Sequence, residues 1–253
     1  MHPDRSSFSL RVAAYVAALF ALMAAIGLLV TRVLNHTAPI SGEDSFNRTL
    51  VLDRTPTGNR FTGDLSKLAS TPIIIGILIV LVIVFRLVYQ RWRESLFLFL
   101  TVGTQTLVFL ATAALIHRNR PAVAHLDPAP PTSSFPSGHT GAATALFVGT
   151  ALVVGWHTRH SWVRVLLVLV GVAVPAAVGY SRLYRGMHHP SDVVAAFVNG
   201  LLAVSIWARN VLFGVLPDRW AHALDGDRRD RRDRRDRRDG QDAMPGKAAG
   251  ASA

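Results

Sequence analysis

Six long apolar runs dominate this chain and limit what it can fold into. They cover roughly residues 12–30, 72–84 with an extension to 89, 96–116, 141–156, 165–180 and 193–216. Apolar runs of about 18 or more residues can cross the hydrocarbon core of a bilayer as helices. Because backbone polar groups must be paired within lipid, the runs predict helices rather than strands. A soluble bundle, the alternative, would need amphipathic helices with polar outer faces, which these runs lack.

The sequence therefore predicts an all-α, polytopic membrane protein with six transmembrane helices in a bundle. Half of the residues are hydrophobic and only 17% are charged. The chain has no cysteine, which excludes disulfides, thiol nucleophiles and cysteine-ligated metals. The first apolar run is long for a signal peptide and lacks a clear cleavage site, so we expect an uncleaved span.

The positive charge has a distribution that fits a membrane protein better than a nucleic-acid-binding one. Much of the formal net charge of +11 lies in the Arg-Arg-Asp repeats of residues 228–239 and in short loops beside the apolar runs. Cytoplasmic loops are enriched in basic residues. With six spans, the basic loops and both termini fall on one side, which we predict to be the cytoplasm.

Four arginines on the opposite side run against this rule: Arg118, Arg120, Arg182 and Arg185. Anion binding would explain their position, since a guanidinium matches the geometry of phosphate oxygens. The segment Pro136-Ser137-Gly138 lies beside them, directly before an apolar run, where free backbone N–H groups can bind an anion. We therefore predict that Arg120, Arg182, Ser137 and Gly138 bind phosphate at the extracytoplasmic face.

Three further residues have the chemistry for phosphoryl transfer. His188 and Asp192 are four residues apart at the predicted start of the sixth helix, so the carboxylate can bond one ring nitrogen of the histidine. The other nitrogen is then free to attack phosphorus and form a phosphohistidine. His139 is predicted to protonate the leaving oxygen and later activate water.

These segments resemble the type 2 phosphatidic acid phosphatase superfamily, which includes bacterial lipid phosphatases and is similar to vanadium haloperoxidases. Pro-Ser-Gly-His is complete at residues 136–139, and Ser-Arg-x5-His-x3-Asp is complete from Ser181 to Asp192. The first motif, Lys-x6-Arg-Pro, keeps Arg120 and Pro121 but has Ala113 at the lysine position. We predict that Arg118 partly replaces the missing lysine, with His117 as the weaker candidate.

Several neighbouring residues allow more than one interpretation. His189 could serve as a nucleophile on chemistry alone, but the motif spacing favours His188. His125 and Asp127 are expected to be a polar loop end rather than a substrate rim. Arg185 fits equally well as a phosphate contact or as a charge facing lipid headgroups. The apolar residues within segment 35–71 allow a short interfacial helix.

The resemblance implies a phosphatase that hydrolyses a phosphomonoester or diphosphate of a membrane lipid, such as undecaprenyl diphosphate or phosphatidic acid. The alternatives are a lipid phosphotransferase using the same histidine and a non-catalytic lipid-phosphate-binding homologue. No cofactor or metal is implied. The expected partners are the phosphorylated lipid and the bilayer, without nucleic acid, and a homodimer stays open. We expect a membrane domain at residues 1–216, with its motif core at 113–192, and a disordered cytoplasmic tail at 217–253.

Overall fold

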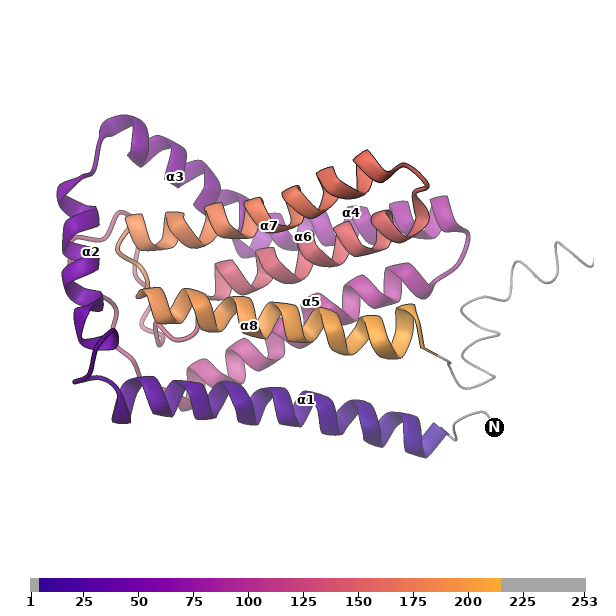
Figure 1. Ribbon diagram of the computed structural model, residues 1–253, viewed down its shortest axis with the longest axis horizontal. Helices are drawn as coiled ribbons and strands as arrows, with labels where there is room; N and C mark the ends of the chain where they lie inside the picture. The colour runs from indigo at the N-terminus through magenta and orange to yellow at the C-terminus, as the bar shows by residue number, and fades with distance from the viewer. Residues whose placement is uncertain (1–4, 215–253) are drawn as a thin grey trace, which may run out of the picture.

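A computed structural model of the protein describes residues 5–214, and this range is helical without a strand (Figure 1). Six helices within it are long and apolar enough to cross a membrane. They are α1 (Arg5–Leu28), α4 (Thr71–Tyr89), α5 (Arg93–Leu115), α6 (Gly138–His157), α7 (Ser161–Tyr184) and α8 (Pro190–Trp207). Short π-helical segments, η1 (Leu29–Val33) and η3 (Ala208–Leu212), prolong α1 and α8. The predicted fold class and the six predicted spans are thus confirmed.

The helices α6 and α8 begin three residues earlier than their apolar runs. Ser137 is the N-cap of α6, and Pro190 stands in the first turn of α8, where a missing N–H costs no hydrogen bond. Both first turns are polar, so hydropathy alone could not reveal them. As a result, His139 lies within a helix rather than in the preceding loop, and Asp192 lies in the first turn of α8, at the predicted start of the sixth helix. The predicted tail at 217–253 lies outside the described residues.

Two short helices cover one end of the bundle. A 3-10 turn, η2 (Ile40–Gly42), leads into α2 (Glu43–Leu52), and α3 (Pro56–Leu68) connects it to α4. The side chain of Thr55 caps α3 by accepting a hydrogen bond from the N–H of Gly58 at 3.0 Å. Figure 1 shows α2 lying across the ends of the long helices. Segment 35–71, whose apolar residues allowed a short helix, contains both α2 and α3.

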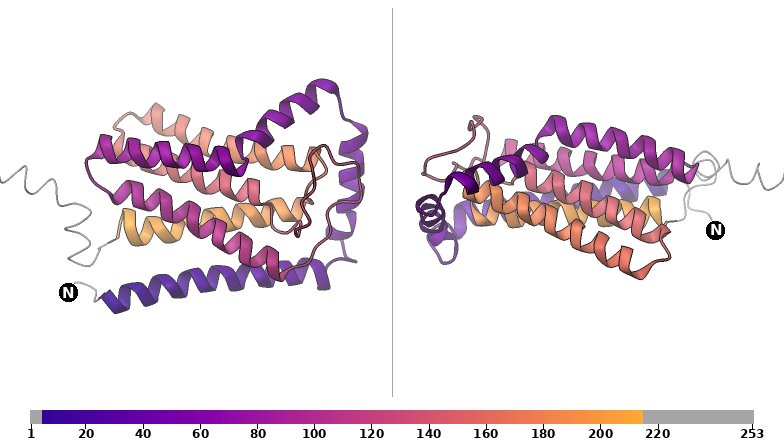
Figure 2. Two further views of the ribbon diagram at one scale, coloured as in Figure 1. Left: turned by 180° about the vertical axis from the view of Figure 1, so that it is seen from behind. Right: turned by 90° about the horizontal axis from the view of Figure 1, so that it is seen from above.

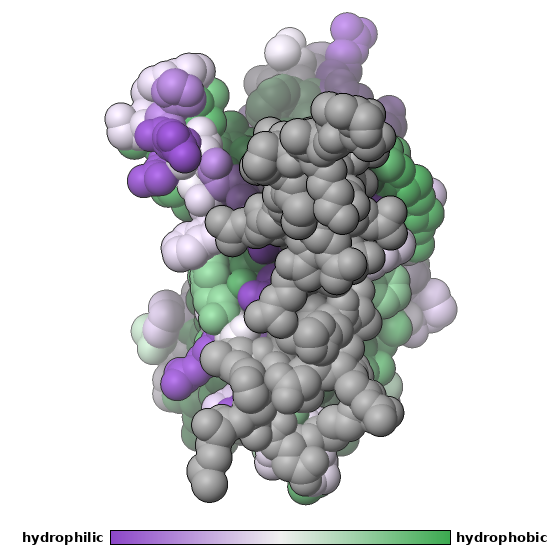
Figure 3. Space-filling model, turned by 90° about the vertical axis from the view of Figure 1, so that its right-hand side faces the viewer, coloured by the Kyte–Doolittle hydropathy of each residue, from purple (hydrophilic) through white to green (hydrophobic). Residues whose placement is uncertain are grey.

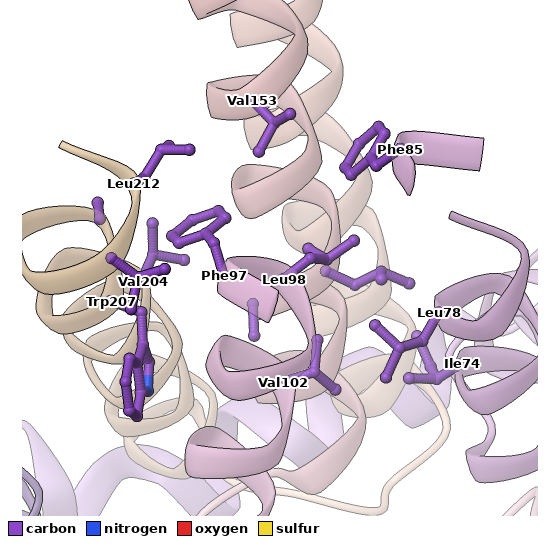
Figure 4. Close-up of a cluster of buried hydrophobic side chains, with 14 of the residues drawn as sticks. Ile74, Leu78, Phe85, Phe97, Leu98, Val102, Val153, Val204, Trp207 and Leu212 are labelled. Carbon is purple, nitrogen blue, oxygen red and sulfur yellow. The ribbon is translucent and has the colours of Figure 1, made fainter. Parts of the chain in front are cut away.

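The bundle has an apolar interior and an apolar outer surface. Phe97 and Leu98 of α5 are fully buried at the centre of the largest core cluster, where they meet side chains of α4, α6 and α8 (Figure 4). By contrast, only 11% of the most apolar stretch of α4 is buried inside the protein. Figure 3 shows hydrophobic residues on the flanks of the molecule. Since exposing such flanks to water is unfavourable, they fit contact with lipid tails, and the chain is a multi-pass membrane protein.

Both motif segments lie at the same end of the bundle. The segment that joins α5 to α6 runs across this end close to α2, as the two views in Figure 2 show. The turn between α7 and α8 lies at this end as well, whereas the connections α4–α5 and α6–α7 lie at the other (Figure 1). The structure thereby brings together residues that are far apart in sequence. That this end faces outward stays a prediction from the arginine distribution.

Candidate active site

A cavity of about 640 Å³ opens at this end of the bundle. Its wall contains five of the predicted site residues, which come from three separate segments: Arg120, Gly138, His139, Arg182 and His188. Two predicted site residues, Ser137 and Asp192, are fully buried behind this wall. The structure thus separates the side chains of the wall, which can touch a ligand, from the buried side chains that lie behind it.

Ser137 makes two hydrogen bonds within the protein. Its N–H donates to the backbone carbonyl of Asp192 at 3.1 Å, and its hydroxyl bonds that of Thr140 at 3.0 Å. The N–H is therefore not available to a phosphate, whereas contact of the Ser137 hydroxyl with phosphate stays a prediction. The residue ties the start of α6 to the start of α8. The first-turn N–H groups that follow it, beginning at Gly138, have no intrahelical acceptor.

His188 is held by a backbone carbonyl more closely than by the predicted carboxylate. Its Nδ1 lies 2.7 Å from the carbonyl oxygen of Ser134 and 3.7 Å from Oδ2 of Asp192. A carbonyl oxygen can only accept, so Nδ1 carries the proton and Nε2 carries the lone pair. Burial lowers the pKa of His188, which favours the neutral imidazole. The prediction that Asp192 bonds this ring directly is corrected: the carboxylate supports it electrostatically.

Asp192 belongs to a buried network that also engages Arg118. The guanidinium of Arg118 donates to Asp192 at 2.5 Å and to Glu43 at 2.6 Å. Glu43 in turn accepts from the backbone N–H of Ser191 at 2.6 Å. Arg118 therefore does not face the cavity, and the prediction that it replaces the missing lysine is wrong. It links α2 to the first turn of α8. His117, the weaker candidate, does not line the cavity either.

The cavity arginines retain unmet hydrogen-bond donors. One terminal nitrogen of Arg120 donates to the carbonyl of Met187 at 2.8 Å, and one of Arg182 donates to Asp127 at 2.6 Å. In both residues the Nε–H is buried without a partner. A buried unpaired donor is costly, and more so in a cation. A ligand with several acceptor oxygens would satisfy these donors.

Asp127 is a site residue that the sequence did not reveal. Its carboxylate accepts from Arg182 and, at 2.5 Å, from Arg185. Burial alone would raise the pKa of Asp127, but the hydrogen bonds and charges of the two arginines outweigh burial and lower it to about 2. The expected polar loop end is therefore a bridge between two cavity arginines. No spacing signal exists, since Asp127 precedes Arg182 by 55 residues.

The remaining alternatives are resolved by position. His189 does not line the cavity and contacts Asp44 at 3.3 Å, so the geometry favours His188 as the reactive histidine. Arg185 is paired with Asp127 and lines the cavity, rather than facing headgroups. The imidazole of His125 contacts the carbonyl of Pro121 at 3.0 Å, as expected of a loop end.

The sequence and the fold that carry this cavity are similar to those of known proteins. The PAP2 superfamily model matches residues 94–213, a range that contains both complete motifs and every cavity residue of α5 to α8. Over these residues the chain is similar to the PAP2 superfamily. This bears out the resemblance drawn from the motifs alone.

The similar proteins include phosphatases of membrane lipids. Phosphatidylglycerophosphatase B of Bacillus subtilis is 27% identical over 69% of this chain and 86% of its own length. An undecaprenyl-diphosphatase of Sulfolobus acidocaldarius is 39% identical, over 30% of this chain and 32% of its own length. The crystal structure of a PAP2-type phosphatidylglycerolphosphate phosphatase from Bacillus subtilis superimposes with a TM-score of 0.67 at 24% identity. It covers 76% of this chain and 93% of that one, which shows a shared fold.

Proposed function

We propose that this protein hydrolyses a phosphomonoester or diphosphate of a membrane lipid through a phosphohistidine intermediate. The observation that carries the proposal is the composition of the cavity wall. Two histidines and three arginines line one cavity; they come from three segments of the chain, and each arginine has a buried Nε–H without a partner. The same wall continues into apolar side chains such as Ile74 and Phe109, which suit the lipid part of a substrate.

In the first step, Arg120, Arg182 and the first-turn N–H groups from Gly138 onward hold the phosphate oxygens. Positively charged donors of this kind stabilise the transition state of phosphoryl transfer. Nε2 of His188 attacks phosphorus while the bond between phosphorus and the leaving oxygen breaks. His139 gives its proton to that oxygen when the leaving group is an alcohol.

In the second step, His139 takes a proton from water, and the resulting hydroxide oxygen attacks phosphorus. The bond between phosphorus and Nε2 of His188 breaks, which releases inorganic phosphate. Throughout both steps the Ser134 carbonyl keeps the proton of His188 on Nδ1. The buried carboxylate of Asp192 offsets the positive charge that the ring gains as it attacks.

The proposal requires no metal ion. The cations of the cavity are guanidinium groups, and residues 5–214 contain no cluster of three His, Asp or Glu side chains that could hold a metal. We also propose that the cavity faces the extracytoplasmic side, with both termini in the cytoplasm, because the basic loops lie at the opposite end.

Phosphate release from purified protein in lipid nanodiscs tests the proposal. The substrates are undecaprenyl diphosphate, phosphatidic acid and phosphatidylglycerol phosphate, each with and without EDTA. We expect release from at least one of them, unchanged by EDTA. Arg182→Ala should lower its rate by about 10²–10³-fold, whereas Arg164→Ala, at the exposed opposite end, should not. Release from none of the lipids would refute the function, and inhibition by EDTA would refute the metal-free mechanism.

A further inference from the structure

One wall of the cavity is a continuous strip from the end of α3 and the start of α4. The α3 part has helical spacing of three and four residues, so its side chains lie on one face. The wall residues of the strip, in chain order, are Gly63, Ser66, Lys67, Ala69, Ser70, Thr71, Ile74 and Ile75. None of them belongs to the catalytic motifs.

The strip changes from polar to apolar along its length. At its polar end, the hydroxyl of Ser66 accepts from Arg182 at 2.5 Å and donates to Asp127 at 3.2 Å. At its apolar end, Ile74 and Ile75 belong to the lipid-spanning helix α4. A lipid whose terminal phosphate meets Arg182 and whose chain lies along α4 must therefore pass the middle of the strip.

The middle of the strip contains one cation and two hydroxyl groups. Lys67 is the single lysine among residues 5–214. Its ammonium lies 3.6 Å from Asp64, but the two side chains are 76% and 78% exposed, and exposed ion pairs of this kind are weak. Ser70 is the N-cap of α4 and makes no side-chain capping bond. Because its pairing with Asp64 is weak, Lys67 can turn its flexible side chain toward a ligand at low cost.

The charges elsewhere in the site indicate which group of a ligand Lys67 would bind. A terminal phosphate already has Arg120 and Arg182. Arg118, the predicted replacement for the missing lysine, is paired with Glu43 and Asp192. In a lipid monophosphate, the group that follows the phosphate is a neutral ester or alkyl chain. A lysine between the arginines and the apolar wall is useful to a substrate with a second anionic group at that position.

We propose that Lys67, together with the hydroxyls of Ser70 and Thr71, forms a subsite for the inner phosphate of a lipid diphosphate. This rests on the proposed function. The terminal phosphate occupies the arginines, and the bond that breaks joins its phosphorus to the bridging oxygen. The leaving group is then the lipid monophosphate, and Lys67 stabilises the negative charge that this group gains. Lys67 is accordingly a specificity-determining residue.

The test compares two substrates that share one chain and differ by one phosphate: farnesyl diphosphate and farnesyl phosphate. We expect Lys67→Ala to lower kcat/KM about tenfold for the diphosphate, the loss typical of one charge-assisted hydrogen bond, and less than about twofold for the monophosphate. Lys67→Arg should keep most of the activity on both. Arg60→Ala, an exposed position on α3 outside the cavity wall, is the matched control and should change neither.

The outcomes separate the two proposals. An equal loss on both substrates, or no loss on the diphosphate, would overturn the subsite. A wild-type protein that cleaves the monophosphate but not the diphosphate would also overturn it, while the proposed phosphatase function would stand. Failure of the wild-type protein on both of these and on the membrane lipids would instead contradict the proposed function itself.

Discussion

The two ends of the bundle each contain a histidine, arginine and a buried carboxylate, yet they differ in what these groups bind. At the end away from the motifs, Glu94 is fully buried, and both its oxygens accept from Nε of Arg91, at 2.7 and 2.9 Å. Nε2 of His157 lies 2.9 Å from the same carboxylate, and its ring stacks on Tyr89 at 4.1 Å. The charged groups of this cluster thus pair with one another.

At the motif end, the same residue types leave donors unmet. Nε of Arg120 and Nε of Arg182 have no partner, and both residues line a cavity with His188. A cluster whose hydrogen-bonding groups pair with one another stabilises a contact between helices. Donors without a partner beside a cavity need a ligand. The contrast shows that the kind of residue does not distinguish a ligand site from a structural contact. What distinguishes them is whether the hydrogen-bonding groups have partners within the protein.

The largest expected difference between the ends comes from removing one histidine at each. His139→Ala should lower kcat by about 10²–10⁴-fold, the usual contribution of a general acid-base group. His157→Ala should leave kcat within about twofold, because His157 lies at the far ends of the helices that carry the site. It should lower the free energy of unfolding by about 1–3 kcal/mol, because buried Glu94 loses a partner.

Steady-state kinetics and thermal unfolding in the same detergent measure both effects. A strong loss of kcat in His157→Ala with an intact fold would show that the two ends of the bundle are coupled, which contradicts a purely structural role of His157. Full activity in His139→Ala would remove the proposed acid-base role.

A smaller effect is expected from Glu43, which acts on the site only through other residues. Glu43→Gln keeps the shape but removes the charge that holds Arg118, so Asp192 and the first turn of α8 lose their support. We expect kcat to fall about tenfold with KM nearly unchanged, in line with the effect of residues that orient a reactive group. Glu43→Asp should recover part of the loss. An unchanged kcat in Glu43→Gln would show that the network is only structural.

The smallest effect concerns the protonation of His188. Its pKa is lowered mainly by burial, so the ring should stay neutral below the ordinary pKa of about 6.5. The unfolded chain takes up this proton first, and His188 therefore makes folding less favourable as the pH falls below about 6.5. Nuclear magnetic resonance of ¹⁵N-labelled histidine, with His188→Gln to assign the signal, measures the midpoint. A midpoint at or above 6.5 would contradict the burial argument.

The sequence alone was enough to predict the helical class, the six spans and the meeting of both motif segments at one end of the bundle. Apolar runs report directly on lipid contact, and fixed motif spacings report on residues that lie close together in the chain. His188, favoured over His189 by the motif spacing, lines the cavity, and its role as nucleophile stays a proposal. These signals are local in the chain.

The pairing within the site could not be predicted, because it depends on contacts between distant segments. Arg118 was expected to face phosphate, yet Glu43, which is 75 residues away in the chain, holds it elsewhere. The Ser134 carbonyl that orients His188 carries no side-chain signal, since every residue has one. Asp127 was missed for the same reason: only the folded chain brings its loop to Arg182 and Arg185.

The most direct test of the account is a search for a covalent intermediate on His188. The wild-type protein is mixed with a ³²P-labelled lipid substrate and quenched in alkali, which preserves phosphohistidine, and the labelled peptide is identified by mass spectrometry. We predict label on His188, none in His188→Ala, and no turnover by that variant although it folds. Turnover by His188→Ala, or label on another residue, would contradict the central claim that His188 is the nucleophile.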